Sequence, residues 1–275
     1  MAIYVYGLIR TGVPLPTLPQ GISPDVPIHV ISEGEVAAVS HAVPEREFNN
    51  ETLEVRFQDL IWLEGAVQAH EAIVETVMRT TPILPMRFCT VYMAEEGIRQ
   101  TLRRYGTRCI EALDFLNNKA EWGLKVFCDR EVVRRNILEE DETIRQRKRA
   151  IEGKPAGTTY LLRKRVELVC LTRTEEEIER LINTVEIEVE TFGIERFLHE
   201  TICMTDENRQ IILNISYLVV DDRVDDLIER VQEINDRYGK RGIRCILSGP
   251  WPPYGFTGRL FESETISHRE TSASA

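Results

Sequence analysis

Histidine and its neighbours are the first place to look for chemistry in this chain. His70 is followed by Glu71, which matches the start of the zinc-binding HExxH pattern, but Val74 stands where the second histidine would be needed. His70 also falls on an apolar helical stripe, so we interpret it as a hydrogen-bonded core histidine, with catalysis as the alternative. His199 lies on an expected strand whose same-face neighbours are not metal ligands, so no metal site is predicted there.

Arg87 lies between Met86 and Phe88, in an apolar segment that also contains Pro85. A guanidinium in apolar surroundings requires a carboxylate or several carbonyl partners. We therefore predict that Arg87 is mostly buried and paired with an acidic residue of the first domain. The alternative is an anion-binding site.

The remaining reactive groups form no recognisable site. The six cysteines are spread widely and contain no CxxC pair, so we expect reduced, mostly buried thiols and no zinc. The stretch GKPAGT at 153–158 lacks the spacing of a phosphate-binding loop and does not follow a strand. We predict no cofactor, no metal and no catalytic residue.

A stiff aromatic segment, LSGPWPPYGF at 247–256, follows the last expected strand. Its prolines fix φ near about −65°, and its glycine allows the chain to leave the strand at an angle closed to other residues. We predict that Trp251 packs against the protein itself and that Tyr254 is more exposed and available to a partner; the alternative makes Trp251 an interface anchor. The core of the segment is Gly249, Pro250, Trp251, Pro252, Pro253 and Tyr254.

Composition limits the classes of protein. The 275 residues are 43% hydrophobic and 29% charged, as in a soluble globular protein, and no apolar run approaches the roughly 20 residues of a membrane span. The apolar N-terminus resembles a first strand and not a signal peptide. A net charge of −11 argues against a general nucleic-acid binder.

Charge is unevenly distributed in the second half. Residues 145–165 are rich in Arg and Lys, and residues 175–190 are rich in Glu. We interpret this region as a solvated helical surface, with a docking surface for a charged partner as the alternative.

Hydrophobic periodicity predicts an α+β protein of two domains. In the first, strands are expected at 3–8, 28–31 and 35–40, helices at 52–78 and 98–116, and a proline-broken edge strand or bulge at 81–93. In the second, strands at 122–127, 194–202, 211–220 and 243–248 alternate with a long helical region ending near 191 and a helix at 221–239.

The order of the second half is β-α-β-β-α-β, so we expect a ferredoxin-like domain with an enlarged helical insertion. The predicted boundaries are 1–118 for an N-terminal α+β domain and 119–261 for the ferredoxin-like domain. A polar, disordered tail is predicted at 262–275.

Several stretches in order resemble one family, the F/L family of gas vesicle proteins. They are IYVYGLI, HEAIVETVMRTTPILPMRFCTVY, EWGLKVF, KPAGTTYLLRKR and LSGPWPPYGF, and the resemblance covers roughly residues 3–257. The family's usual glycine after the Arg-Phe dipeptide is Cys89 here, which questions whether this position needs a positive φ.

The resemblance implies a non-enzymatic, accessory or minor structural protein needed for gas vesicle assembly. It implies association with the major shell protein, and with other gas vesicle accessory proteins as a further option, at the vesicle in the cytoplasm. A regulatory small-molecule-binding module is the alternative, resting on fold analogy alone. An enzyme built around Arg87 and His70 is the third hypothesis.

Overall fold

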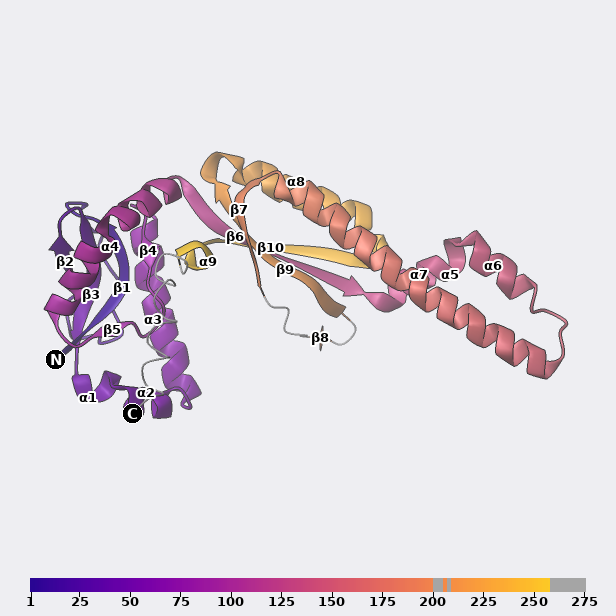
Figure 1. Cartoon of the computed structure of the whole chain (residues 1–275), viewed down its shortest axis with the longest axis horizontal. Coiled ribbons are helices and arrows are strands. Elements are labelled where there is room, and N and C mark those ends of the chain that lie inside the picture. Colours follow the sequence, from indigo (N-terminus) through magenta and orange to yellow (C-terminus); the bar gives the residue numbers. More distant parts are fainter. Residues whose placement is uncertain (200–204, 207–208, 258–275) are drawn as a thin grey trace. The chain divides into compact units, whose positions relative to one another are not determined.

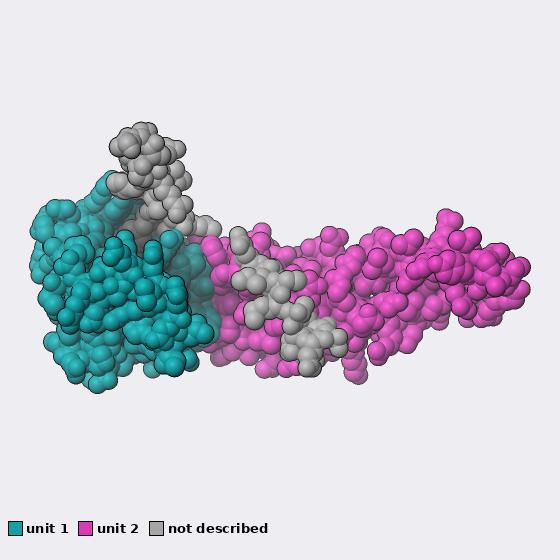
Figure 2. Space-filling model, turned by 90° about the horizontal axis from the view of Figure 1, so that it is seen from below, with its two compact units in different colours: residues 1–121, 250–275 teal, residues 122–249 magenta. Residues whose placement is uncertain are grey.

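The computed structural model describes residues 1–199, 205–206 and 209–257, and these divide into two compact units. The first contains residues 1–121 and 250 onward, and the second residues 122–249 (Figure 1, Figure 2). The division near residue 121 lies close to the expected one, but residues 250–257 belong to the first unit, whereas we had assigned them to the second domain. The predicted tail lies outside the described residues. In the described part, no helix is both long and apolar enough to cross a membrane.

The first unit is built on an antiparallel sheet in the order β2-β3-β1-β4, with β5 also paired to β1. The helices α3 and α4 pack against this sheet (Figure 1). The elements are β1 (Ala2–Arg10), β2 (His29–Glu33), β3 (Val36–Val43), α1 (Glu45–Phe48), α2 (Asn50–Arg56), α3 (Leu60–Met78), β4 (Leu84–Pro85), β5 (Val91–Tyr92) and α4 (Glu95–Leu116).

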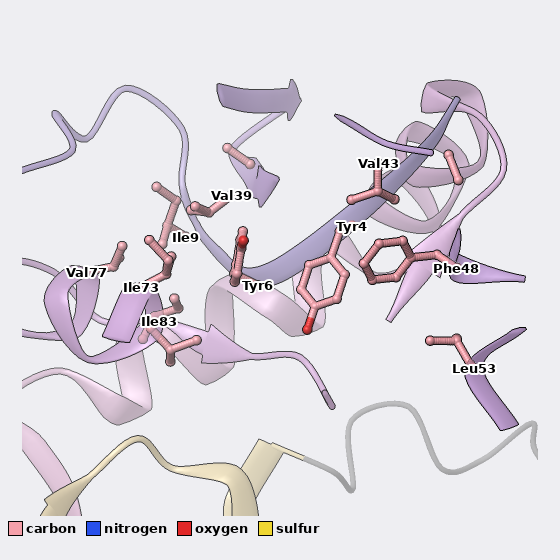
Figure 3. Close-up of a cluster of buried hydrophobic side chains, with 13 residues drawn as sticks. Tyr4, Tyr6, Ile9, Val39, Val43, Phe48, Leu53, Ile73, Val77 and Ile83 are labelled. Atoms are coloured by element: carbon pink, nitrogen blue, oxygen red, sulfur yellow. The ribbon is translucent and has the colours of Figure 1, made fainter. Parts of the chain in front are cut away.

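Both faces of the sheet are covered, which explains why β1 and β3 are almost continuously apolar and buried. The register of β1 against β3 shifts between Val5 and Gly7. Because a bulge reverses the alternation of side chains, Tyr4 before it, Tyr6 at it and Ile9 after it enter the same core (Figure 3). That core also receives Ile73, Val74 and Val77 from α3.

The helix expected at 52–78 is two helices. The break follows from local capping, because the Asp59 carboxylate accepts hydrogen bonds from the N–H groups of Ile61 and Trp62 and starts α3 there. Asn49 starts α2 in the same way by accepting from the N–H of Thr52. The hydrophobic stripe continues across the break, so periodicity alone did not detect it.

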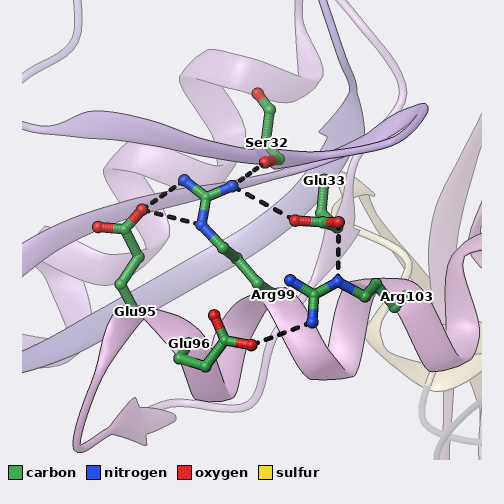
Figure 4. Close-up of polar contacts among 6 residues, drawn as sticks. All are labelled: Ser32, Glu33, Glu95, Glu96, Arg99 and Arg103. Atoms are coloured by element: carbon green, nitrogen blue, oxygen red, sulfur yellow. Dashed lines mark hydrogen bonds and ion pairs between the residues drawn. The ribbon is translucent and has the colours of Figure 1, made fainter.

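Charged side chains join α4 to β2 (Figure 4). The Arg99 guanidinium donates to the carbonyl of Ser32 at 2.6 Å, and Glu33 accepts from Arg103 at 2.8 Å. The hydrogen bond from Arg103 holds the pKa of Glu33 below its usual value. Glu33 and Arg99 are half-buried and Arg103 is exposed, so water still screens these pairs, and they orient α4 more than they stabilise it.

The second unit has a sheet in the order β10-β6-β9-β7, with β8 paired to β9. Its order along the chain is strand, helices, three strands (of which β8 is short), helix and strand. The elements are β6 (Lys119–Asp129), α5 (Arg130–Glu140), α6 (Glu142–Arg149), α7 (Ala156–Glu190), β7 (Gly193–Leu198), β8 (Thr205–Asp206), β9 (Arg209–Val220), α8 (Val224–Tyr238) and β10 (Ile243–Trp251).

At the free edge of β10, a side chain forms hydrogen bonds with the backbone of one residue. Asn235 of α8 accepts from the N–H of Cys245 at 2.7 Å and donates to its carbonyl at 2.9 Å. Unpaired backbone groups on an edge strand can pair with other chains. The Asn235 amide occupies the N–H and C=O of Cys245, so these two groups are not available for such pairing. The edge position also explains why β10 tolerates Pro250.

The long helical insertion follows β6, as expected, and is broken where GKPAG predicts. α5 and α6 pack along α7 (Figure 1). Aspartates start the first two helices, because Asp129 and Asp141 accept from N–H groups of α5 and α6. The insertion has its own small core of Ile144, Ile151, Val166 and Cys170.

Two glycines of the first unit give a matched test of this packing. A Cβ at Gly7 would lie 2.6 Å from Ile83 Cδ1 and 2.9 Å from the backbone oxygen of Leu84, whereas a Cβ at Gly65 on α3 meets nothing within 4 Å. Gly7→Ala should lower the free energy of unfolding by about 1–3 kcal/mol through overpacking. Gly65→Ala should raise it by up to about 1 kcal/mol through helix propensity. Urea unfolding checks both, and a neutral Gly7→Ala would contradict the described pairing of β1 with β4.

Candidate functional site

Three of the stretches singled out in the sequence meet at His70 of α3. The ring is fully buried. Its Nδ1 lies 2.8 Å from the Tyr4 hydroxyl of β1, and its Nε2 lies 3.1 Å from the Tyr254 hydroxyl of the C-terminal segment. Phe88 packs edge-on against the imidazole, with centroids 5.9 Å apart. His70 is therefore a hydrogen-bonded core histidine, as expected.

The outer partners limit how these groups can bond. A neutral imidazole carries one N–H and one acceptor nitrogen, so one tyrosine hydroxyl donates to the ring and the other accepts from it. The Tyr4 oxygen also accepts from the N–H of Cys89 at 3.1 Å. We therefore expect His70 in a single tautomer.

Burial fixes the protonation states of this chain of groups. It lowers the pKa of His70 to about 4, so the ring is neutral at pH 7. It also raises the pKa of the Tyr4 and Tyr254 hydroxyls, which therefore stay protonated, and raises the pKa of Glu71. His70 and the two tyrosines are therefore not poised to exchange a proton at pH 7, so the arrangement suits structure better than acid–base catalysis.

A second tyrosine–histidine pair repeats the pattern on the same face of β1. The Tyr6 hydroxyl lies 3.3 Å from Nδ1 of His41 on β3 and accepts from the N–H of Ile22 at 3.0 Å. The Tyr4 and Tyr6 rings are in contact, with centroids 5.0 Å apart. Burial lowers the pKa of His41 to about 4. Each tyrosine of β1 thus has one histidine and one backbone N–H as partners.

The segment between β4 and β5 is a turn that leaves the ladder. Its ends pair with β1, because the N–H of Met86 donates to the carbonyl of Tyr6 and the N–H of Val5 donates to that of Thr90. The N–H of Thr90 also donates to the carbonyl of Arg87 at 3.1 Å, and Cys89 has φ 61°. A positive φ at the third residue only is the signature of a type II turn, which favours glycine there. Cys89 therefore occupies a position that does need a positive φ.

Arg87 is exposed, and the prediction that it is mostly buried was wrong. The reason is the turn, which carries Arg87 out of the apolar ladder that its neighbours enter. Pro85, two residues earlier, is buried in β4, and Phe88, one residue later, is half-buried against His70.

The C-terminal segment also differs from expectation. Trp251 is 45% exposed, whereas Tyr254 is half-buried and bonded to His70, so our assignment of the two rings was reversed. Gly249 has φ 146°, but β10 continues through it to Trp251, so the chain does not leave the strand there as we expected. Trp251 ends an edge strand, and the turn after it directs Tyr254 inward. Pro250 is exposed, and Pro252 and Pro253 are buried.

Further contacts hold this segment within the first unit. The N–H of Gly255 donates to a carboxylate oxygen of the buried Glu121 at 3.0 Å. The short helix α9 (Tyr254–Thr257) packs against β4. The segment therefore closes over the turn and over α3.

Sequence reasoning did not single out Tyr4, Tyr6 or His41, and it considered Glu71 only as part of an HExxH pattern. A signal was present, since two tyrosines at i and i+2 on an apolar strand share one face and need hydroxyl partners when buried. Nε2 of His41 is buried and has no hydrogen-bond partner among the described residues, and no sequence pattern predicts this.

An exposed apolar patch lies beside this network, where α2 meets α3. Phe57 links the two, with its ring 6.2 Å from that of Phe88 and 6.3 Å from that of Trp62. The patch consists of Val55, Phe57, Leu60 and Ile61, which are 69%, 42%, 75% and 86% exposed. Large apolar side chains gathered at one surface typically mark an interaction site.

Comparison with known proteins gives a consistent result. Residues 2–258 match the model of the family described as gas vesicle synthesis protein GvpL/GvpF. The chain is 29% identical over 259 residues to gas vesicle protein L of Streptomyces sp. (strain CB03234), covering 93% of this chain and 92% of that one. It is 24% identical to gas vesicle protein F of the same organism, over 93% and 99% of the two chains.

Two crystal structures share the fold. The gas vesicle protein GvpF from Anabaena sp. PCC7120 superposes with a TM-score of 0.66 at 18% identity, covering 93% of this chain and 98% of that one. GvpF from Microcystis aeruginosa gives 0.62 at 20% identity with the same coverage.

The positive φ of Cys89 is testable with small substitutions. Cys89→Gly and Cys89→Ala both remove the thiol, but only alanine keeps a β-carbon in the left-handed region, so the glycine variant should be more stable by about 1 kcal/mol. Cys109, within α4, is the control, because there alanine should exceed glycine by about 1 kcal/mol. Urea unfolding measures all four, and the same order at both positions would contradict the turn.

Proposed function

Because the chain belongs to the GvpL/GvpF family of gas vesicle synthesis proteins, we propose that it is an accessory or minor structural protein of gas vesicle assembly that binds the major shell protein. We place it at the gas vesicle, in the cytoplasm, in contact with the shell protein and with other accessory proteins. The role is non-enzymatic. The buried tyrosines and histidines support this, because they are bonded to one another and hold neutral forms at pH 7.

The observation that carries the proposal is the apolar patch at the junction of α2 and α3. Ile61 and Leu60 are the most exposed large apolar side chains of the described residues, and both stand in the first turn of α3. An exposed apolar surface of this kind gains free energy when a partner covers it. An apolar shell protein fits it better than a polar metabolite does.

Contacts of Arg56 and the Asp59 cap hold the backbone of the patch in place. Arg56 stacks over the rings of Phe48 and Trp62 at 5.7 and 5.0 Å and pairs with Glu47 at 2.8 Å. The Asp59 cap fixes where α3 begins. Little conformational entropy is then lost when a partner binds, which favours affinity.

We also propose that the second unit is a ferredoxin-like domain with an enlarged first helical connection. The strand order β10-β6-β9-β7 supports this, since numbering the four strands in chain order gives 4-1-3-2. The β8 pairing lies outside this core.

One observation favours the alternative of a regulatory small-molecule module. A cavity of about 690 Å³ lies among α5, α6 and α7, within the range of ligand pockets. Its walls combine the cationic Arg134, Lys148 and Arg163 with apolar Leu138 and Val166. A thermal-shift screen of metabolites separates the two functions, because the assembly role predicts no hit and the module predicts a clear one.

The test of the main proposal is co-purification of the full chain with the major shell protein. Leu60→Glu and Ile61→Glu together should reduce the recovered shell protein at least about tenfold, as loss of central apolar contacts does at interfaces. Met93→Glu is the control, because Met93 is also exposed, at 60%, but lies after β5 and outside the patch. Both variants should melt like the parent. Unchanged recovery with the double variant would contradict binding through the patch.

A further inference from the structure

The helix α7 carries exposed apolar side chains on the face turned away from its own core. Val166, Cys170 and Thr174 are buried against neighbouring elements of the second unit. On the opposite face, Tyr160, Leu161, Leu168 and Leu171 are 62%, 68%, 64% and 56% exposed. This face is neither part of the apolar patch of the first unit nor used in the proposed shell-protein contact.

The spacing on that face is the spacing of a helix-pairing seam. Exposed positions recur by three and four residues, which places them on one line along the helix. Two helices pack along such a line when its central positions are apolar. We define the seam as Lys164, Leu168, Leu171 and Glu175.

The seam matches the same seam of a second copy that runs in the opposite direction. Lys164 stands four residues before Leu168, and Glu175 stands four residues after Leu171. In an antiparallel pair with its two-fold axis between the leucines, Leu168 meets Leu171 of the second copy and Lys164 meets Glu175 of the second copy. In a parallel pair, Lys164 would meet its own equivalent and repel it.

We propose that the exposed face of α7 docks a second copy of this chain, antiparallel, through this seam. A two-fold interface repeats the same patch on both subunits, so a surface whose charges are opposite on either side of an apolar centre matches itself. The sequence is basic before Leu168 and acidic after Leu171. In this pairing, the two stretches together set the antiparallel orientation of the two copies.

Existing ion pairs do not oppose this docking. Lys164 pairs with Glu167 at 3.3 Å and is 60% exposed, and Glu175 pairs with Arg130 and is 51% exposed. Exposed pairs of this kind contribute little, so exchanging them for pairs across the interface is nearly neutral. The apolar centre then provides attraction, and the charges determine orientation.

The interface is small. At 1.5 Å per residue, the seam from 164 to 175 is about 17 Å long. It is therefore at the low end of specific interfaces, and the dimer should be weak, reversible and dependent on concentration. Screening of the charge pairs should weaken it further as salt is raised.

Charge exchange in the full chain tests the proposal by sedimentation velocity over a range of protein concentrations. Lys164→Glu places like charges opposite each other at Glu175, and Glu175→Lys does the same at Lys164, so each should raise the dimer Kd at least about tenfold. The double variant Lys164→Glu/Glu175→Lys restores opposite charges and should return the Kd to within about threefold of the parent.

The control is Arg163→Glu, which makes the same charge change one residue away, on the side of α7 that lines the cavity with Leu138. Its Kd should match that of the parent. Leu168→Ser should abolish the dimer while the thermal melt stays unchanged, because the side chain is 64% exposed. The proposal is overturned if the parent stays monomeric at every concentration, or if the double variant dimerises no better than the single ones.

Discussion

Both nitrogens of the buried His70 imidazole are hydrogen-bonded, and the first unit depends on this constraint. A ring held between Tyr4 and Tyr254 must stay in one place, because leaving either hydroxyl unpaired in the core costs about 1–3 kcal/mol. The two tyrosines come from opposite ends of the chain. The first strand and the last described helix are therefore fixed to the same side chain of α3.

This constraint extends to the turn between β4 and β5. The Tyr4 hydroxyl accepts from the N–H of Cys89, so the turn must present that N–H inward. A positive φ at Cys89 allows the tight turn that does this. The motifs that look unrelated in sequence are thus one structural unit, since each supplies a donor, an acceptor or a backbone conformation to the same network.

Much of the architecture was predictable from the sequence. Alternation and three-four periodicity predicted most of the strands and helices, and glycine and proline predicted the break before α7. The split of the expected 52–78 helix was missed because the Asp59 cap interrupts the backbone without interrupting the hydrophobic stripe. Individual side chains near turns were less predictable.

Arg87 and Trp251 show why. The burial of Arg87 depends on where a turn leaves the sheet, which is decided by backbone hydrogen bonds to β1 and not by the apolar neighbours in the sequence. Trp251 is the last residue of the edge strand β10 and is left exposed there. Tyr254 shows the converse, because a proline-rich segment that looks like a surface anchor carries a half-buried residue bonded to His70.

The two proposed interaction surfaces lie outside this network, and one of them depends on it. The apolar patch includes the first turn of α3, and His70 lies on the same helix. The network therefore fixes the helix that presents Leu60 and Ile61. The insertion of α5, α6 and α7 has its own small core, and its exposed seam is independent of the first unit. The buried aromatic groups have structural roles, and the exposed apolar groups are available for contacts with partners.

The most direct test is the protonation of His70 itself, measured by ¹⁵N NMR of the histidine side chains across a pH titration. The hydrogen-bond chain predicts a neutral ring at pH 7 in a single tautomer. Because burial lowers its pKa to about 4, that tautomer should persist as the pH falls through the usual histidine range near 6.5. A ring that exchanges between tautomers at neutral pH, or one that titrates near 6.5 in the folded protein, would contradict the network.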